Sequence, residues 1–107
     1  MTKINYQDEE LRLVQSRYKN NNALYVGLVD KDGEFYADVT VNLPISTTMP
    51  TDCAFLDGNN LQGIAQILMD AGVVVPLYQS CVNGFYRYFA FRFQNLWDID
   101  DIDTKIN

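Results

Sequence analysis

The stretch Ala23–Pro44, ALYVGLVDKDGEFYADVTVNLP, decides the fold that we expect for this chain. It begins with a nearly continuous apolar run containing β-branched and aromatic residues, which is typical of a central strand. Asp32-Gly33 follows, a dipeptide favoured in hairpin turns because their central positions need positive φ angles. The remainder alternates between apolar and polar residues, as in a half-buried antiparallel strand. The stretch therefore predicts an antiparallel hairpin between Leu24 and Leu43.

The alternation in the second strand of this hairpin predicts one apolar face and one polar face. The apolar face would hold Phe35, Ala37, Val39, Val41 and Leu43. The polar face would hold Tyr36, Asp38, Thr40 and Asn42.

Further elements are predicted on both sides of the hairpin. Strands are expected at KINY, LRLVQSRY, CAFLD, VVVPLY and FYRYFAFRFQ, and a helix in GNNLQGIAQILMDAG. Asn59 or Asn60 would cap this helix, Gly72 would end it, and Pro76 would confine its strand to a sheet edge. This order predicts an α+β fold: a mainly antiparallel sheet with one principal helix packed on a face. We expect a single domain over residues 1–107.

The segment FYRYFAFRFQ, residues 85–94, carries apolar side chains on both faces of its predicted strand. Such a strand is either buried inside the domain or covered on its outer side by a partner. Burial inside the domain is the more economical interpretation.

Composition limits the function classes. The net charge is −6 and the eight basic residues are scattered singly, so the clustered Lys and Arg that nucleic-acid or anionic-membrane binding needs are missing. An acidic chain is instead suited to a basic protein surface. No apolar run is long enough to span a membrane and no signal-peptide core is present, so we expect a cytoplasmic protein.

Catalytic and metal-binding residues are scarce. The chain has no histidine, which excludes Ser or Thr triads, Cys–His pairs and the commonest metal ligand, and it has no phosphate-binding Gly-rich loop. Cys53 and Cys81 fit no zinc motif and are expected to be half-buried thiols. A carboxylate- or metal-dependent mechanism is the remaining catalytic option. We expect no enzyme activity and no cofactor.

The C-terminal segment, residues 96–107, concentrates acidic charge around an apolar stripe. On a helix, Leu96, Ile99, Ile102 and Ile106 would share one face. The aspartates that would face outward are Asp98, Asp100, Asp101 and Asp103. We therefore expect a short acidic C-terminal helix or tail. Its aspartates either solubilise the surface or occupy a basic channel built for phosphates.

The central hairpin supplies a second acidic patch. Asp30, Asp32 and Glu34 lie at its turn, and same-face residues on a strand are spaced at about 6.6 Å, close to the phosphate spacing of a single nucleic-acid strand. Aromatic residues often dominate the energy of an interface. The candidate aromatic anchors are Tyr36, Tyr86, Tyr88 and Trp97.

The motifs DKDGEFYADVTVNLP, CAFLD and DAGVVVPLYQSCVNGF together resemble a small uncharacterised domain family. Its members are carried on conjugative plasmids and integrative elements of Gram-positive bacteria. The matching positions between Leu24 and Phe85 are mostly turn and core residues, so the resemblance implies a shared fold. The segments FYRYFAFRF and DIDDID depart from the family pattern.

In size, charge and implied origin the chain is also similar to type II-A anti-CRISPR proteins. That resemblance implies an inhibitor that blocks guide-RNA or DNA binding by an RNA-guided nuclease, whose channels are positively charged. The alternative is an accessory or regulatory protein of a conjugative element that pairs with a basic relaxase or repressor. Neither hypothesis calls for direct nucleic-acid binding, and the oligomeric state stays open.

Overall fold

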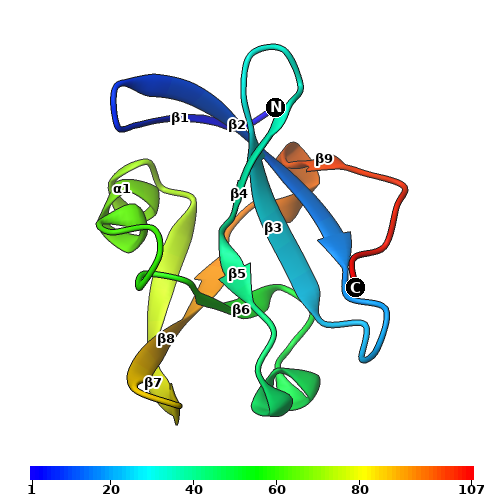
Figure 1. Cartoon of the computed structure of the whole chain (residues 1–107), viewed down its shortest axis with the longest axis vertical. Helices are drawn as coiled ribbons and strands as arrows, with labels where there is room; N and C mark the ends of the chain where they lie inside the picture. Colours follow the sequence, from blue (N-terminus) through cyan, green and yellow to red (C-terminus); the bar gives the residue numbers. More distant parts are fainter.

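The structure, a computed structural model that describes residues 1–107, consists of two sheets and one short α-helix (Figure 1). Four strands of the first sheet are antiparallel neighbours in chain order: β1 (Lys3–Tyr6), β2 (Glu9–Arg17), β3 (Leu24–Val29) and β4 (Phe35–Asp38). A fifth, β9 (Asp100–Asp101), runs parallel to β2.

The second sheet is antiparallel, in the order β5–β6–β8–β7. Its strands are β5 (Thr40–Val41), β6 (Cys53–Leu56), β7 (Val74–Asn83) and β8 (Tyr86–Phe93). The helical elements are η1 (Pro44–Thr48), α1 (Ile64–Asp70) and η2 (Leu96–Asp98). With 48% of residues in strands and 14% in helical elements, the fold is broadly α+β, as predicted, but mainly β. The helix is too short to cross a membrane.

The two sheets share one hydrophobic core. The chain passes from the first sheet to the second at Val39, which is fully buried between β4 and β5. Leu13 and Val26 enter this core from the first sheet, Phe93 enters from the second, and Leu68 enters from α1. Burial of these apolar side chains is the main force that holds the sheets together.

The central hairpin forms between β3 and β4 but ends at Asp38, because Thr40–Val41 pairs with β6 of the second sheet, and the predicted alternation does not hold. A β-bulge shifts the register between Leu28 and Val29, so Ala37 pairs with Leu28 while Phe35 pairs with Val29. Tyr36 is the extra residue of this bulge, and an extra residue reverses the alternation, so that Phe35 and Ala37 no longer face the same side of the sheet. Phe35 is therefore 65% exposed, whereas Tyr36, expected on the polar face, packs edge-on against the ring of Tyr6.

Helix α1 is shorter than predicted because Gly63 stands at its N-cap with φ 79°, which interrupts a helix starting at Asn59 or Asn60. The predicted caps are therefore wrong. The predicted end is correct: Gly72 has φ 73°, and the N–H of Val73 donates to the carbonyl of Leu68 at 2.8 Å, as in a glycine-terminated helix.

The β7–β8 hairpin extends beyond the core. Ala90, Phe91 and Phe93 are buried, but Phe89 is 54% exposed, so the expectation that this whole strand lies inside the domain is wrong. Phe89 pairs with Leu56, the last residue of β6, and the residues of β8 from Tyr86 to Tyr88 have no neighbour on that side. Strand β7 lies at the sheet edge, as expected from its proline.

The predicted C-terminal helix does not form. Strand β1 pairs with β2 as far as Arg12, and the Leu13 N–H donates to the Thr2 carbonyl, so the edge of β2 from Val14 onward has no partner in β1. The C-terminal segment fills this gap: the Ile102 N–H donates to the Gln15 carbonyl and the Ile106 N–H donates to the Arg17 carbonyl, each at 2.9 Å. It is therefore an extended tail that continues the first sheet.

Candidate functional site

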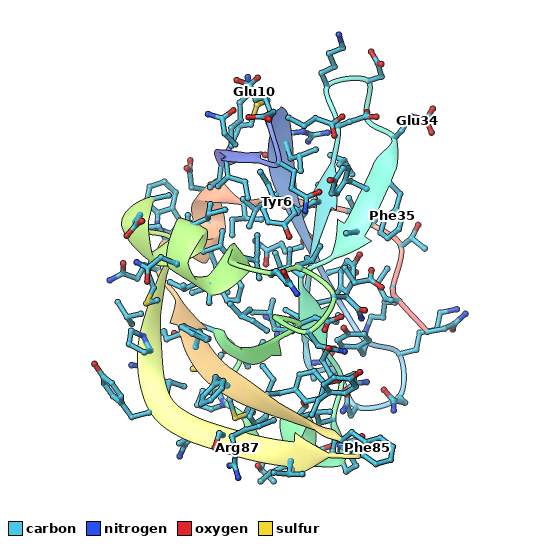
Figure 2. All side chains as sticks on the ribbon, turned by 60° about the vertical axis from the view of Figure 1, so that its left-hand side comes forward. Tyr6, Glu10, Glu34, Phe35, Phe85 and Arg87 are labelled. Carbon is cyan, nitrogen blue, oxygen red and sulfur yellow. The ribbon has the colours of Figure 1, made fainter.

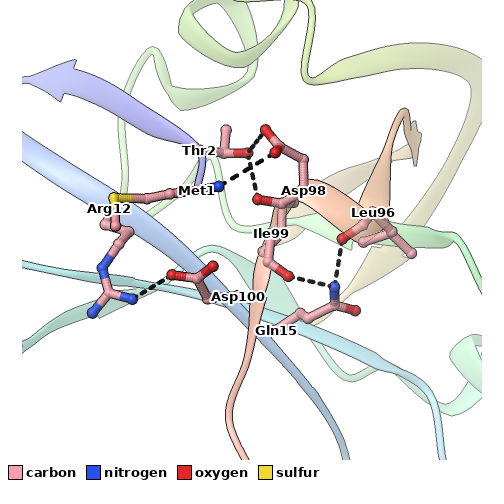
Figure 3. A network of polar contacts seen from close by, with 8 residues as sticks. All are labelled: Met1, Thr2, Arg12, Gln15, Leu96, Asp98, Ile99 and Asp100. Atoms are coloured by element: carbon pink, nitrogen blue, oxygen red, sulfur yellow. Dashed lines mark hydrogen bonds and ion pairs between the residues drawn. The ribbon is translucent and has the colours of Figure 1, made fainter.

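Two of the four predicted tail aspartates are engaged inside the molecule (Figure 3). Asp98 accepts a hydrogen bond from the Thr2 hydroxyl at 3.1 Å and lies 3.3 Å from the amino group of Met1. Asp100 accepts a hydrogen bond from Arg12 at 2.7 Å. These carboxylates fasten the tail to the first sheet, and their charges are compensated within the chain.

The tail is also held by a neutral side chain. The amide of Gln15 donates to the backbone carbonyls of Leu96 at 2.6 Å and of Ile99 at 2.8 Å (Figure 3). These two hydrogen bonds fix η2 against β2, and Ile99 between them is buried in the shared core.

The other two tail aspartates, Asp101 and Asp103, are exposed. They line an open polar pocket of about 280 Å³ together with Arg17 and Lys105. Arg17 donates to the Thr51 carbonyl and Lys105 to the Asn22 side chain, so neither forms an ion pair with these aspartates, but their charges lower the net negative charge around the pocket.

The second predicted patch, Asp30, Asp32 and Glu34, lies on a turn that hydrogen bonds hold in place. The Asp30 carboxylate accepts hydrogen bonds from the backbone N–H groups of Asp32 and Glu34, each at 2.9 Å. Asp32 and Glu34 are themselves exposed. The turn is thus fixed by one acidic side chain while two others face solvent.

The structure adds a neighbouring acidic loop to this turn. Antiparallel pairing of β2 with β3 brings the β1–β2 turn to the same end of the sheet, and Glu10 lines a cavity of about 180 Å³ together with Asp30. Figure 2 shows Glu10 and Glu34 at this end. We call the six carboxylates the acidic end: Asp8, Glu9, Glu10, Asp30, Asp32 and Glu34.

Few cations offset the acidic end. Lys3 lies 3.6 Å from Glu10 and Lys31 lines the same cavity, but Arg12 is already paired with Asp100. Asp8, Glu9 and Glu10, in the segment QDEE, were not among the site residues predicted from the sequence. A strand that pairs antiparallel with Leu24–Val29 and precedes it in the chain begins beside the hairpin turn. The position of QDEE just before LRLVQSRY was therefore the sequence signal for these residues.

The four predicted aromatic anchors do not form one surface. Tyr36 packs against the shared core and Tyr88 packs against the small cluster of Leu43, Phe55 and Ala90, so both are only partly accessible. Trp97 is 84% exposed on η2, and Tyr86 is 49% exposed on the β7–β8 hairpin. Four of the exposed aromatic residues belong to that hairpin: Tyr78, Phe85, Tyr86 and Phe89. Of these, only Tyr86 was predicted.

Asp38, expected on an open polar face, is also engaged. Its carboxylate accepts a hydrogen bond from the Tyr25 hydroxyl at 2.7 Å. Burial, and secondarily this hydrogen bond and the neighbouring charge, raise the pKa of Tyr25 well above its usual value. Asp38 therefore serves the fold and does not extend the acidic end.

The cysteines differ in environment. Cys53 is buried and its thiol donates to Asp52 at 3.3 Å, whereas Cys81 is half-buried. Burial, followed by the hydrogen bond and charge of Asp52, raises the pKa of the Cys53 thiol. A raised pKa disfavours the reactive thiolate. No three cysteine or acidic side chains come together to share a metal ion.

Fold and surface together define a small, mainly β protein with an acidic end and a protruding aromatic hairpin. The chain belongs to a family described as a domain of unknown function (DUF4313), whose sequence pattern matches residues 12–105. This confirms the expected membership of an uncharacterised domain family. No curated protein and no solved structure matches the chain.

Proposed function

We propose that the protein is a non-enzymatic inhibitor that binds a basic, nucleic-acid-binding protein through its acidic end. The observation that carries this proposal is that two turns with six carboxylates lie at one end of the first sheet, where Glu10 and Asp30 line one cavity together with Lys3, Arg12 and Lys31. Such a concentration of one sign of charge attracts a surface of the opposite sign and speeds the encounter.

The shape of the acidic end supports competition with nucleic acid. The turn at Asp30 is held by two hydrogen bonds from its own backbone, so the carboxylates of Asp32 and Glu34 project from a preorganised loop. Preorganised charges lose little conformational entropy on binding. A surface that binds phosphates with Lys and Arg side chains would accept these carboxylates in their place.

The specific target that we propose is a type II-A RNA-guided nuclease in the cytoplasm of a bacterial host, with the gene carried on a mobile element. The support is the resemblance of the sequence to proteins of such elements together with the acidic end. These nucleases hold guide RNA and target DNA in positively charged channels. Occupation of one channel would block guide loading or DNA docking.

The test measures binding of the purified protein to a type II-A nuclease, with and without bound guide RNA, at several salt concentrations. We expect binding to the guide-free nuclease that weakens as salt rises. The variant Asp8→Asn, Glu9→Gln, Asp32→Asn, Glu34→Gln should lose at least about tenfold in affinity. It spares Asp30 and Glu10, which have intramolecular roles.

A matched control neutralises two exposed carboxylates elsewhere. The variant Asp101→Asn, Asp103→Asn should keep most of the affinity, because these carboxylates lie outside the acidic end and share their pocket with Arg17 and Lys105. Equal losses in both variants would contradict a specific acidic end. Absence of binding to the nuclease would overturn the anti-CRISPR proposal, and salt-sensitive binding to a basic relaxase would then favour the accessory-protein alternative.

A further inference from the structure

The tip of the β7–β8 hairpin carries an unusual side chain. The hairpin closes through the two residues Gly84-Phe85, and Gly84 has φ 65°, as the first central position of a type II′ turn requires. Phe85 is fully exposed, so its ring has no covering contact within the chain. An aromatic side chain of this size gains free energy from any partner that removes it from water.

An apolar cavity lies beside this tip. It has a volume of about 330 Å³ and opens between the start of α1 and the inner face of β8. Leu56, Ala65, Phe89 and Phe91 supply apolar surface, and Arg87 lies among the polar lining residues. Such a cavity suits one aromatic side chain.

We propose that the occupant of this cavity is Phe85 of a second copy of the chain. In a two-fold dimer the same surface is used by both copies, so each Phe85 would enter the cavity of its partner. Phe85 in the turn and Phe89 in the cavity wall are four residues apart, about 13 Å along extended backbone. Two hairpins that lie side by side in opposite directions, offset by this length, make both insertions at once.

The distribution of acidic charge is compatible with this contact. Strand β7 contains no charged residue, although edge strands are usually protected by lysine or other charges. The proposed arrangement brings the two Arg87 residues near the two-fold axis, and each donates to the Ser80 hydroxyl of its own hairpin at 2.7 Å. Figure 2 shows Phe85 at the opposite end of the molecule from Glu10 and Glu34. Two chains of charge −6 can therefore meet at this hairpin with their acidic ends apart.

The dimer would carry two acidic ends on one particle, so binding of the first to a clustered or repeated basic target would raise the effective concentration of the second. This inference does not depend on the proposed function. Self-association through the hairpin can be measured in the absence of any other protein.

The first test is the mass of the purified protein in solution, by light scattering after size exclusion and by sedimentation equilibrium. We expect a concentration-dependent approach to twice the chain mass of 12.3 kDa. Phe85→Ser should raise the dimer dissociation constant about 30-fold, because buried aromatic anchors dominate such contacts. Trp97→Ser, which removes a comparably exposed aromatic side chain from η2, should leave it unchanged.

The second test separates the inserted ring from the cavity. Ala65→Phe fills the cavity but keeps Phe85, whereas Phe85→Ser keeps the cavity but lacks the ring. Each variant alone should be monomeric, and their equimolar mixture should recover part of the dimer through one remaining insertion. Thermal unfolding of each variant confirms that it is folded.

Three outcomes would overturn the proposal: a wild-type protein that is monomeric at all concentrations, a dimer that tolerates Phe85→Ser, or a mixture no more associated than its components. A monomeric protein that binds a different protein through the hairpin would assign the cavity to that other class of partner.

Discussion

At the scale of single residues, Tyr25 organises one side of the first sheet. Its ring is 3% exposed and packs edge-on against Tyr18, with 5.6 Å between ring centroids. The ring also lies over Gly27, where an added Cβ would stand 2.3 Å from the Tyr25 hydroxyl oxygen. The hydroxyl is satisfied by Asp38, so this polar group is buried without leaving a donor unpaired.

The buried hydroxyl of Tyr25 makes stability depend on alkaline pH. Its pKa is raised in the folded protein, whereas in the unfolded chain a tyrosine ionises near pH 10. Above about pH 10 the unfolded state therefore loses protons that the folded state keeps, and the free energy of unfolding falls as pH rises. We expect denaturant titrations between pH 8 and pH 11 to show this fall, reduced in Tyr25→Phe.

The same variant should be about 1–2 kcal/mol less stable than wild type at pH 8, because Asp38 loses its partner. Some alkaline dependence should remain, since burial also raises the pKa of Tyr18 and Tyr6. Tyr78→Phe is the control, because that ring is 92% exposed and its replacement should leave the slope unchanged. A Tyr25→Phe protein that loses stability as steeply as wild type would contradict the assignment.

At the scale of elements, the sequence predicted those whose signal is local. The turn at Asp32-Gly33 and the helix end at Gly72 each need a residue type that is visible at that position. The conformation of the C-terminal tail could not be predicted in this way, because its isoleucines at every third or fourth position fit a helix as well as they fit an extended segment. The tail is extended because it pairs with the part of β2 that β1 leaves open, at Val14 and Gln15. These residues lie far from the tail in the sequence.

This difference between a helix and a paired tail can be measured with two isoleucines. Ile99 is 2% exposed and belongs to the shared core, whereas Ile106 is only half-buried beside Tyr18. We expect Ile99→Ala to lower the free energy of unfolding by about 2–5 kcal/mol and Ile106→Ala by less than about 1 kcal/mol. Equilibrium denaturation of both variants gives the comparison, and similar losses would contradict the tail seen here.

At the scale of the whole molecule, the candidate site was harder to predict than the fold. The acidic residues were visible in the sequence, but whether each is free to bind a partner depends on residues far away in the chain. Arg12 forms an ion pair with Asp100, while the pairing of β2 with β3 brings Glu10 near the hairpin turn. The predicted burial of the aromatic strand β8 was wrong for a related reason. Whether Phe89 is buried depends on what covers the sheet beyond its partner Leu56, at the end of β6, and the residues of β8 do not encode that.

The shared core also predicts how the chain unfolds. Val26 on β3 and Val74 on β7 belong to the same buried cluster although they lie on different sheets, so neither sheet can keep its apolar face covered after the other opens. We therefore expect one cooperative transition for residues 1–107, as for most small domains. Native-state hydrogen exchange should give β2, β3, β6 and the core half of β8 one common free energy of opening.

Val26→Ala and Val74→Ala provide the decisive comparison, because both side chains are almost completely buried. Each substitution should lower that common value by about 2 kcal/mol in both sheets at once. The exposed tip around Phe85 is excluded from the comparison, since it lies beyond the core and exchanges by local fraying. If Val26→Ala weakened protection in the first sheet while β6 and β8 kept theirs, the sheets would be separate cooperative units and the single-domain interpretation would be wrong.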